Sequence, residues 1–247
     1  MKIALLGYGK MGKAIEKIAL AKGHDIVYKV NMENAFDFMP ISLQNVNVAI
    51  DFSMPSAAVD NILKCFEVKV PIIVGTTGWY DQFDMIKDKC INEGQSMVYS
   101  TNFSIGVNIF YKLNKILAKM MANHQDYDVM IEEVHHTEKK DHPSGTALSL
   151  ANQILAEGGI KKEWKGRLLY NENMPSQSVK KHELLIESKR VGDVTGDHSV
   201  KYESMIDEIT ITHKAKSRYG FAKGAVFAAE WIQGKQGIYT MEDLLKL

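Results

Sequence analysis

The N-terminus of the chain indicates a strand, a glycine-rich turn and a helix in immediate succession. Residues 2–6 form a short apolar run, the turn Gly-Tyr-Gly-Lys-Met-Gly occupies 7–12, and apolar residues then recur at helical spacing. Glycines at such a turn permit a tight bend and let backbone N–H groups approach a pyrophosphate. We therefore expect a dinucleotide site here, with a plain tight turn as the alternative. The expected contacts are Gly7, Gly9, Lys10, Met11 and Gly12.

Strands and helices keep alternating through the first part of the chain. Apolar runs predict strands, and longer periodic segments predict helices. The strands are expected at 26–30, 46–50, 70–74 and 96–100, and the helices at 56–66 and 81–92. Such alternation is typical of an α/β domain with a doubly wound, Rossmann-like sheet that is covered by helices on both faces.

The pattern changes after Asn102. Two helices, at 107–122 and 146–157, flank a strand at 128–133. Three consecutive β patterns and a last helix follow, at 184–188, 199–204, 207–212 and 224–233. Consecutive strands indicate a second, α+β domain built on a mixed or antiparallel sheet. The glycine-containing stretch 190–198 predicts a hairpin between two of these strands.

Composition and charge exclude several classes of protein. The 247 residues, 45% of them hydrophobic, suffice for one large domain or two modest ones. Thirty basic and thirty acidic residues cancel, so no global field favours nucleic acid or an anionic membrane. No apolar run approaches the roughly 20 residues of a membrane span, and no signal peptide is expected. We therefore expect no nucleic-acid or membrane partner. Cys65 and Cys90 favour reduced, packed thiols, which predicts a cytoplasmic protein.

The densest group of titratable side chains lies in residues 133–147, Glu-Val-His-His-Thr-Glu-Lys-Lys-Asp-His-Pro-Ser-Gly-Thr-Ala. Ser144, Gly145 and Thr146 precede an apolar helical run. Unpaired N–H groups at a helix start favour an anion, so we expect a carboxylate or phosphate pocket beside the histidines and lysines. The alternative is a solvated loop followed by an ordinary serine N-cap.

Zinc is a competing use of these histidines. The available ligands would be His135, His136, His142 and Asp141. Neighbouring histidines on an extended chain point to opposite faces, and the stretch contains no cysteine. We therefore expect no metal.

The same stretch resembles the signature of the dihydrodipicolinate reductase family, Glu-x-His-His-x-x-Lys-x-Asp-x-Pro-Ser-Gly-Thr-Ala, and meets all ten fixed positions. The family's Gly-Thr-Thr-Gly recurs at 75–78 and its Asn-Phe-Ser-x-Gly-Val-Asn at 102–108. Many members have one more residue in the first glycine loop than this chain. The resemblance implies a nicotinamide-dependent oxidoreductase of diaminopimelate and lysine biosynthesis. Such an enzyme reduces a cyclic, unsaturated dicarboxylate derived from 4-hydroxy-tetrahydrodipicolinate to tetrahydrodipicolinate.

The resemblance also implies roles for individual residues. His135 matches the family's general acid, and Lys139 matches the position that stabilises or protonates the developing enamine; which of them delivers the proton stays open. His136, Gly145 and Thr146 match substrate-binding positions. Further cofactor contacts implied in this way are Asp51, Gly75, Thr76, Thr77, Ser100, Asn102, Phe103 and Arg218. An ordinary turn at Asp51 and a surface arginine at Arg218 are the alternatives.

The choice between NADH and NADPH depends on the end of the second strand, where related folds place an acidic residue on the ribose. This chain has Asn31 there, with Lys29 just before it. No carboxylate repels a 2′-phosphate, so we expect NADPH to be accepted, and Glu33 in the next loop would let NADH serve as well. The alternative is that Asn31 is only a turn residue.

The resemblance implies a dinucleotide-binding domain of residues 1–103 and 218–247, and a substrate-binding and oligomerisation domain of residues 104–217 that forms a homotetramer. Two other functions stay open. Another NAD(P)-dependent dehydrogenase of amino-acid biosynthesis would share the nucleotide half, but the aspartate-semialdehyde type needs a nucleophilic cysteine, and both cysteines lack a catalytic context. A non-catalytic nucleotide sensor would keep the glycine turn and dispense with the second site.

Overall fold

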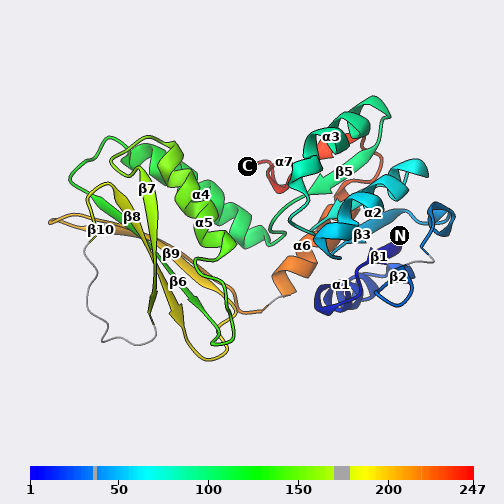
Figure 1. Ribbon diagram of the computed structural model, residues 1–247, viewed down its shortest axis with the longest axis horizontal. Helices are drawn as coiled ribbons and strands as arrows, with labels where there is room; N and C mark the ends of the chain where they lie inside the picture. Colours follow the sequence, from blue (N-terminus) through cyan, green and yellow to red (C-terminus); the bar gives the residue numbers. More distant parts are fainter. Residues whose placement is uncertain (36–37, 170–178, 218) are drawn as a thin grey trace. The chain divides into compact units, whose positions relative to one another are not determined.

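The chain forms two compact units, each built on its own β-sheet (Figure 1). This computed structural model describes residues 1–35, 38–169, 179–217 and 219–247. The first unit comprises Met1–Asn108 and Tyr219–Leu247, and the second comprises Ile109–Arg218. The boundary falls inside helix α4 (Ile105–Met121), so the helix begins in one unit and continues into the other.

All six strands of the first unit's sheet are parallel, in the order β11-β5-β4-β3-β1-β2. The strands are β1 (Lys2–Leu6), β2 (Asp25–Val30), β3 (Val48–Asp51), β4 (Ile72–Val74), β5 (Ser96–Tyr99) and β11 (Gly237–Tyr239). The last strand of the chain lies beside β5, so segments from both ends of the sequence share one sheet.

Helices cover both faces of this sheet. They are α1 (Lys10–Ala21), α2 (Pro55–Glu67), α3 (Phe83–Asn92), α6 (Tyr219–Trp231) and α7 (Met241–Leu245), with short 3-10 helices η2 (Pro40–Leu43) and η3 (Tyr80–Gln82). Successive side chains of a strand point to opposite faces. Ile3 and Leu5 therefore join a core with α1, α6 and α7, while Ala4 and Leu6 join a core with α2 and α3. Burial on both faces explains why these strands are continuous apolar runs in the sequence.

The second unit has a mixed sheet of five strands in the order β10-β9-β6-β8-β7. They are β6 (Asp128–His135), β7 (Glu163–Leu169), β8 (Glu183–Arg190), β9 (Asp197–Glu203) and β10 (Glu208–Lys214). The central strand, β6, runs parallel to β8 and antiparallel to β9. Residues far apart in sequence are therefore neighbours on either side of β6.

Helices α4 and α5 (Gly145–Ala156) cover one face of the mixed sheet (Figure 1). The inward residues Val129 and Ile131 of β6 join the core beneath them. The register aligns a polar row across the opposite face, made of Arg167, Glu187, Glu132, Ser199 and Thr212. The second unit therefore follows the one-sided pattern of an α+β domain.

The expected fold class is confirmed for both units. The expected hairpin at 190–198 is wrong, because β6 lies between β8 and β9 and the two strands do not pair. Strands β7 and β11 were not foreseen. The first carries alternating charged residues and has no apolar run, and the second is only three residues long.

Cys65 and Cys90 are free, buried thiols in α2 and α3, as the sequence predicts. Burial raises the pKa of Cys65 well above its usual value and that of Cys90 to about 11. A thiol that stays protonated is a poor nucleophile. Within the described ranges, no helix is both long and apolar enough to cross a membrane.

Candidate active site

The glycine turn lines an open pocket of about 470 Å³ in the first unit. The lining residues are Gly9, Lys10, Met11, Phe52, Ser53, Pro55, Gly75, Thr76 and Thr77. They come from the turns that follow β1, β3 and β4. The carboxyl ends of neighbouring parallel strands share one edge of a sheet, which is where ligands bind in this class of fold.

The glycines of the first turn differ in what surrounds them. Gly7 has a φ of +95°, and a Cβ there would lie 2.2 Å from the carbonyl oxygen of Phe52. A Cβ on Gly12 would lie 2.4 Å from the carbonyl oxygen of Gly7, whereas Gly9 faces open space. Gly9 is the N-cap of α1 and forms no side-chain cap, so the first N–H groups of the helix can approach an anion. The turn therefore fits a dinucleotide pyrophosphate.

Asp51 lies beneath this pocket, outside its lining. Its carboxylate is fully buried and accepts hydrogen bonds from Ser53 Oγ (2.8 Å), Asn61 Nδ2 (2.7 Å) and Thr76 Oγ1 (2.5 Å). Burial raises the pKa of Asp51, and these hydrogen bonds oppose the rise. The carboxylate fixes the turns after β3 and β4, so it shapes the pocket through Ser53 and Thr76.

Asn31 follows β2 and closes a turn. Its Oδ1 accepts hydrogen bonds from the backbone N–H groups of Glu33 (2.8 Å) and Asn34 (3.2 Å). Lys29 Nζ lies 2.5 Å from Glu16 Oε1, and this contact raises the pKa of Lys29. Asn31 therefore has the turn role that was weighed as the alternative. The charge of Lys29 is already paired with Glu16.

Ser100 and Asn102 shape the segment between β5 and α4. Ser100 Oγ donates to the carbonyl oxygen of Asn102 (2.8 Å), and Asn102 Oδ1 accepts from Ser104 N (2.9 Å). Phe103 is buried in the first unit's core. These three expected cofactor residues lie outside the pocket lining, and Arg218 lies outside the described residues. A cofactor role for the four of them stays a prediction.

In the second unit, the sheet register gathers a buried carboxylate and two imidazoles. Glu133 of β6 pairs with Ser188 of β8 and with His198 of β9. Its carboxylate is fully buried and accepts hydrogen bonds from Ser188 Oγ (2.7 Å) and Ser144 N (3.1 Å). His198 Nε2 and His135 Nδ1 lie 3.5 and 3.7 Å from Glu133 Oε2. We call these five residues the Glu133 cluster.

Two pKa shifts define the charge of the cluster. Burial would raise the pKa of Glu133, but hydrogen bonds from three neighbours in the cluster outweigh burial and lower it to about 2. Burial is the main reason that the pKa of His135 falls to about 4. At neutral pH an ionised Glu133 therefore faces a neutral His135.

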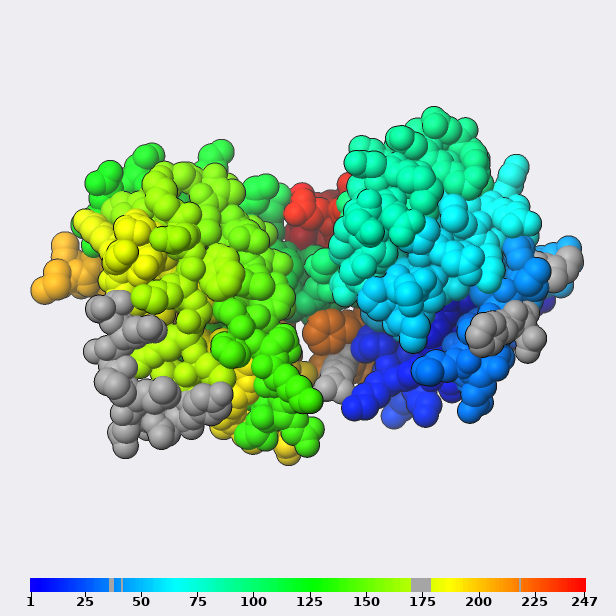
Figure 2. Space-filling model, viewed as in Figure 1, coloured from blue at the N-terminus to red at the C-terminus, as the bar shows by residue number. Residues whose placement is uncertain are grey.

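Lys139 is half-buried in the loop 136–143 that follows β6, and this loop lies on the surface of the second unit (Figure 2). Its Nζ lies 2.7 Å from both carboxylate oxygens of Asp141. Arg190 holds the loop, because its Nε donates to the carbonyl oxygen of Lys139 (3.0 Å) and its Nη2 to that of Asp141 (2.8 Å). The half-buried His136 lies in the same loop. The charges of Lys139 and Arg190 add to the lowering of the pKa of His135.

Helix α5 begins where the sequence predicts an anion pocket. Ser144 is its N-cap and accepts a hydrogen bond from Ala147 N (3.2 Å) through its hydroxyl. A Cβ on Gly145 would meet open space, and the Thr146 hydroxyl is hydrogen-bonded to Tyr111 of α4. The first turn carries no acidic residue, so the positive end of the helix has no carboxylate of its own. The ordinary serine N-cap, weighed as the alternative, is therefore present, and the anion pocket at the same turn stays a prediction.

Glu133, His135 and His198 also offer three ligand atoms within 4.8 Å of one another. This set differs from the zinc ligands weighed from the sequence, of which it contains only His135. Ser144 and Ser188 already donate to the carboxylate. The Glu133 carboxylate therefore has hydrogen-bond donors of its own, whereas Nδ1 of His135 and Nδ1 of His198 have no partner among the described residues.

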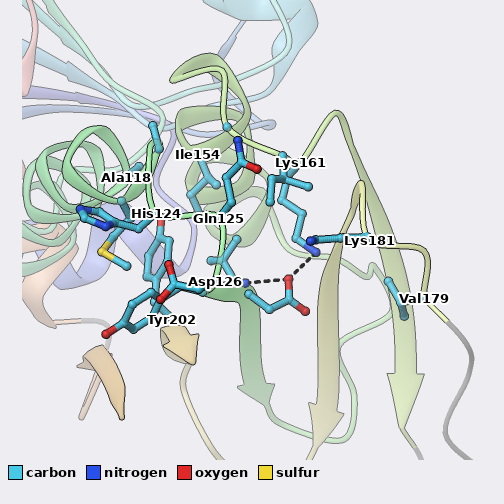
Figure 3. A pocket seen from close by; sticks show the side chains of 16 residues that line it. Ala118, His124, Gln125, Asp126, Ile154, Lys161, Val179, Lys181 and Tyr202 are labelled. Carbon is cyan, nitrogen blue, oxygen red and sulfur yellow. Dashed lines mark hydrogen bonds and ion pairs between the residues drawn. The ribbon is translucent and has the colours of Figure 1, made fainter. Parts of the chain in front are cut away.

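A second cavity, of about 420 Å³, is lined by other residues of the second unit (Figure 3). Within it, Lys161 Nζ lies 2.6 Å from Asp128 Oδ1 and donates to the carbonyl oxygen of Glu183 (2.7 Å). The predicted catalytic and substrate-binding residues lie outside this lining. This cavity and the Glu133 cluster therefore lie at different places in the second unit, and the candidate active site is the Glu133 cluster.

Sequence models of one family match both halves of the chain. The model for the N-terminus of dihydrodipicolinate reductase matches residues 1–103, and that for its C-terminus matches residues 106–245. The chain belongs to the dihydrodipicolinate reductase family. Among its relatives, the 4-hydroxy-tetrahydrodipicolinate reductase of Christiangramia forsetii is 46% identical over 99% of this chain and 98% of its own length. That of Methanosarcina barkeri is 43% identical over 81% of this chain and 73% of its own length.

The fold is shared within the dihydrodipicolinate reductase family and beyond it. A dipicolinate-bound dihydrodipicolinate reductase from Paenisporosarcina sp. TG-14 has a TM-score of 0.78 at 19% identity, over 97% of both chains. An amine dehydrogenase from Mycobacterium smegmatis has a TM-score of 0.61 at 11% identity, over 96% of this chain and 94% of its own. Identities this low concern the fold alone.

The family motif implies roles for His135 and Lys139 but none for Glu133, Ser188 or His198. Ser188 and His198 carry no local signal, because only the strand order brings them beside β6. Glu133 does carry one. It occupies an inward position in the buried series of β6, after Val129 and Ile131, where an unpaired carboxylate would be costly.

Proposed function

We propose that this chain catalyses the NAD(P)H-dependent reduction of 4-hydroxy-tetrahydrodipicolinate to tetrahydrodipicolinate in diaminopimelate and lysine biosynthesis. The observation that carries the proposal is the stretch 133–147, which folds into the Glu133 cluster and the start of α5. A cyclic dicarboxylate needs a site for its carboxylate and a nearby proton donor, and this stretch offers both. Family membership and the dipicolinate bound to the Paenisporosarcina reductase support the same substrate class.

A nicotinamide nucleotide would supply the hydride. We assign its pyrophosphate to the N–H groups at the start of α1, because Gly9 leaves that helix end open. Lys10 lines the same pocket and offers a positive charge to a phosphate. Gly75, Thr76 and Thr77 are assigned to the nicotinamide side. Both NADH and NADPH are expected to serve.

The start of α5 is assigned to a substrate carboxylate. Gly145 offers its N–H, and Thr146 offers a hydroxyl that Tyr111 holds in place. A hydrogen bond to a charged group is worth about 1.5–3 kcal/mol, so two such donors would orient the ring. His136 is assigned to the same substrate.

His135 and Lys139 are assigned to proton delivery and to stabilisation of the developing enamine. The pKa of His135 is about 4 in the ligand-free protein because of burial. A bound dicarboxylate adds negative charge nearby, which favours the imidazolium form. Lys139 is half-buried and paired with Asp141, and its ammonium could instead pair with a substrate carboxylate or donate a proton to the enamine, leaving a neutral amine.

The first unit is proposed as the dinucleotide-binding domain and the second as the substrate-binding and oligomerisation domain. The face of the second sheet that no described helix covers is the proposed contact surface of a homotetramer. The free thiols of Cys65 and Cys90 agree with the prediction of a cytoplasmic protein.

An assay with freshly made 4-hydroxy-tetrahydrodipicolinate and either NADH or NADPH tests the proposal. We expect oxidation of the nucleotide only when the substrate is present, and a higher melting temperature in the presence of 2,6-pyridinedicarboxylate. Nucleotide binding without substrate-dependent oxidation would indicate a sensor. Oxidation with other substrates and no response to 2,6-pyridinedicarboxylate would indicate a different dehydrogenase.

A further inference from the structure

Glu133 is a fully buried carboxylate, and the fold keeps it charged. Its exposed fraction is 0%, and its contacts are Ser144, Ser188 and the two imidazoles. Burying a charge among neutral donors costs free energy that an amide of the same shape would avoid. A charge retained in such a place points to an electrostatic role.

The carboxylate fastens the start of α5 to the sheet. Ser144 N lies 3.1 Å from Glu133 Oε1 and 3.2 Å from Oε2, and Ser144 is the N-cap of the helix. Ser188 Oγ of β8 also donates to Oε1, at 2.7 Å. The position of the proposed carboxylate pocket therefore depends on Glu133.

The same carboxylate faces one nitrogen of His135. Nδ1 is buried, lies 3.7 Å from Glu133 Oε2 and has no hydrogen-bond partner in the described part of the chain. The other nitrogen, Nε2, lies beside Gly196, where a Cβ would come within 3.1 Å of it. A carboxylate on one side of an imidazole favours the tautomer that places the proton on that side. The opposite nitrogen is then left to exchange a proton with a ligand.

We propose that Glu133 is the positioning residue of the second-unit site, orienting His135 through Nδ1 and placing the start of α5 through Ser144. This inference rests on the proposed function, in which His135 acts on the substrate. Through one buried carboxylate, the proton donor and the carboxylate pocket are kept in a fixed relation.

Four charged or titratable groups face His135 from the elements packed around it. They are Glu133 of β6, His198 of β9, Arg190 of β8 and Lys139 of the following loop. Glu133 alone among them favours the imidazolium, and the other three oppose it. Removal of the Glu133 charge therefore makes the acid form of His135 less accessible.

The variant Glu133→Gln removes the charge and keeps an oxygen that can accept from Ser144 N. We expect kcat to fall about tenfold or more, by analogy with the loss of the carboxylate that orients a metal-bound histidine. KM should change little, because the start of α5 keeps its acceptor. The activity limb assigned to His135 in the pH profile should move to lower pH. Glu132→Gln is the matched control, since Glu132 is the neighbouring residue of β6 and pairs with Lys189 on the other face.

Nitrogen NMR of the His135 ring provides a readout that needs no turnover. In the wild-type protein at neutral pH, we expect the proton on Nδ1 and a bare Nε2. In Glu133→Gln this preference should be lost, and in Glu132→Gln it should persist. His135→Gln identifies the resonances.

The outcomes separate the two proposals. A wild-type His135 protonated on Nε2 overturns the positioning role, even if Glu133→Gln fails to fold. A Glu133→Gln variant with wild-type kcat, pH profile and tautomer also overturns it. If the wild-type protein has no reductase activity, the proposed function fails, while the tautomer measurement still decides whether Glu133 orients His135.

Discussion

Asp51 and Glu133 are both fully buried carboxylates, one in each unit, and their surroundings differ. Asp51 meets neutral donors from the turns after β3 and β4 and from α2, and burial raises its pKa. Glu133 faces two imidazoles in addition to its neutral donors, and hydrogen bonds that outweigh burial lower its pKa to about 2. The first carboxylate holds backbone turns in place, and the second also sets the charge of a neighbouring group.

The same contrast separates the two sites that these carboxylates support. The first unit presents a pocket lined by turns and by the N–H groups of a helix start. The second unit presents side chains brought together by sheet register. Changes in the second site should therefore affect the rate of reaction and the binding of the dicarboxylate, and changes in the first should affect which nucleotide binds.

The largest effect is expected from His135→Ala and Lys139→Ala. General acid–base groups contribute about 10²–10⁴-fold, so each variant should lower kcat by at least ~100-fold with the fold intact. Lys140→Ala is the control, because Lys140 is the exposed neighbour of Lys139. If both variants keep more than half of the wild-type kcat, the catalytic assignment is wrong, and the second site does not set the rate of reaction.

A smaller effect is expected from Thr146→Val, which keeps the shape and removes the hydroxyl. Loss of a hydrogen bond to a charged group, about 1.5–3 kcal/mol, should weaken binding of 2,6-pyridinedicarboxylate roughly 10- to 150-fold. Nucleotide affinity should barely change, since the glycine turn lies in the other unit. Isothermal titration measures both ligands, and Ser149→Ala removes a nearby hydroxyl of α5 as a control. Equal loss of both affinities would mean a folding defect, and no loss would remove Thr146 from the site.

The pH dependence of stability offers a third test. Burial lowers the pKa of His135 from 6.5 to about 4, so an unfolded chain takes up this proton first as the pH falls. The neutral His135 contributes its full share to the free energy of unfolding above pH 6.5 and loses it towards pH 4. The free energy of unfolding should therefore fall by roughly 2 kcal/mol between pH 6.5 and 5. In urea denaturation, His135→Gln should flatten the curve over this window, whereas His182→Gln, at an exposed position, should not. A curve unchanged by His135→Gln would contradict a buried, neutral His135.

At lower pH, Glu133 and Asp51 should change the free energy of unfolding in opposite directions. The lowered pKa of Glu133 gives a contribution that is present above pH 4.5 and lost as the pH falls towards about 2. Asp51 has a raised pKa, so its protonation in acid favours the folded state. Relative to wild type, Glu133→Gln should reduce the acid sensitivity and Asp51→Asn should increase it. Shifts of the same sign would show that the two carboxylates are equivalent.

The smallest effect concerns the nucleotide. We expect kcat/KM with NADPH to be no less than about a tenth of the NADH value, a difference of ~1.4 kcal/mol. Asn31→Asp should shift the ratio towards NADH, because a carboxylate accepts from the 2′-OH and repels a 2′-phosphate. Asn34→Asp adds the same charge in the same turn and serves as the control. An unchanged ratio for Asn31→Asp would limit Asn31 to the turn that it closes.

The two sites also differ in how far the sequence predicts them. The glycine turn is local, so its strand, helix and glycine positions are visible within residues 2–21. The start of α5 is equally local, and Ser144 caps the helix where the sequence places it. The Glu133 cluster is not local, because Ser188 and His198 flank Glu133 only through the order β8-β6-β9. No periodicity fixes that order, and the hairpin predicted between β8 and β9 would have kept the cluster apart.

Some residues were placed by motif but not by geometry. Asp51 and Phe103 were expected at the cofactor, yet one lies beneath the pocket and the other in the core. A motif records which residues recur together and does not separate contact with a ligand from support of those that make it. In the structure, the hydrogen bonds of Asp51 to Ser53, Asn61 and Thr76 show that it supports the residues of the pocket and does not line the pocket itself.

The first unit is assembled from two stretches of chain separated by the entire second unit. The core that Ile3 and Leu5 form with α1, α6 and α7 contains eighteen buried residues, and eight of them belong to the segment after residue 218. During synthesis the N-terminal stretch emerges first, with a partial core and with β5 still lacking its neighbour β11. The second unit is continuous, and its core residues are all made before residues 219–247 are added. Domains usually fold in the order of synthesis. Here the continuous second unit can fold first, and the first unit is completed only when residues 219–247 have been added.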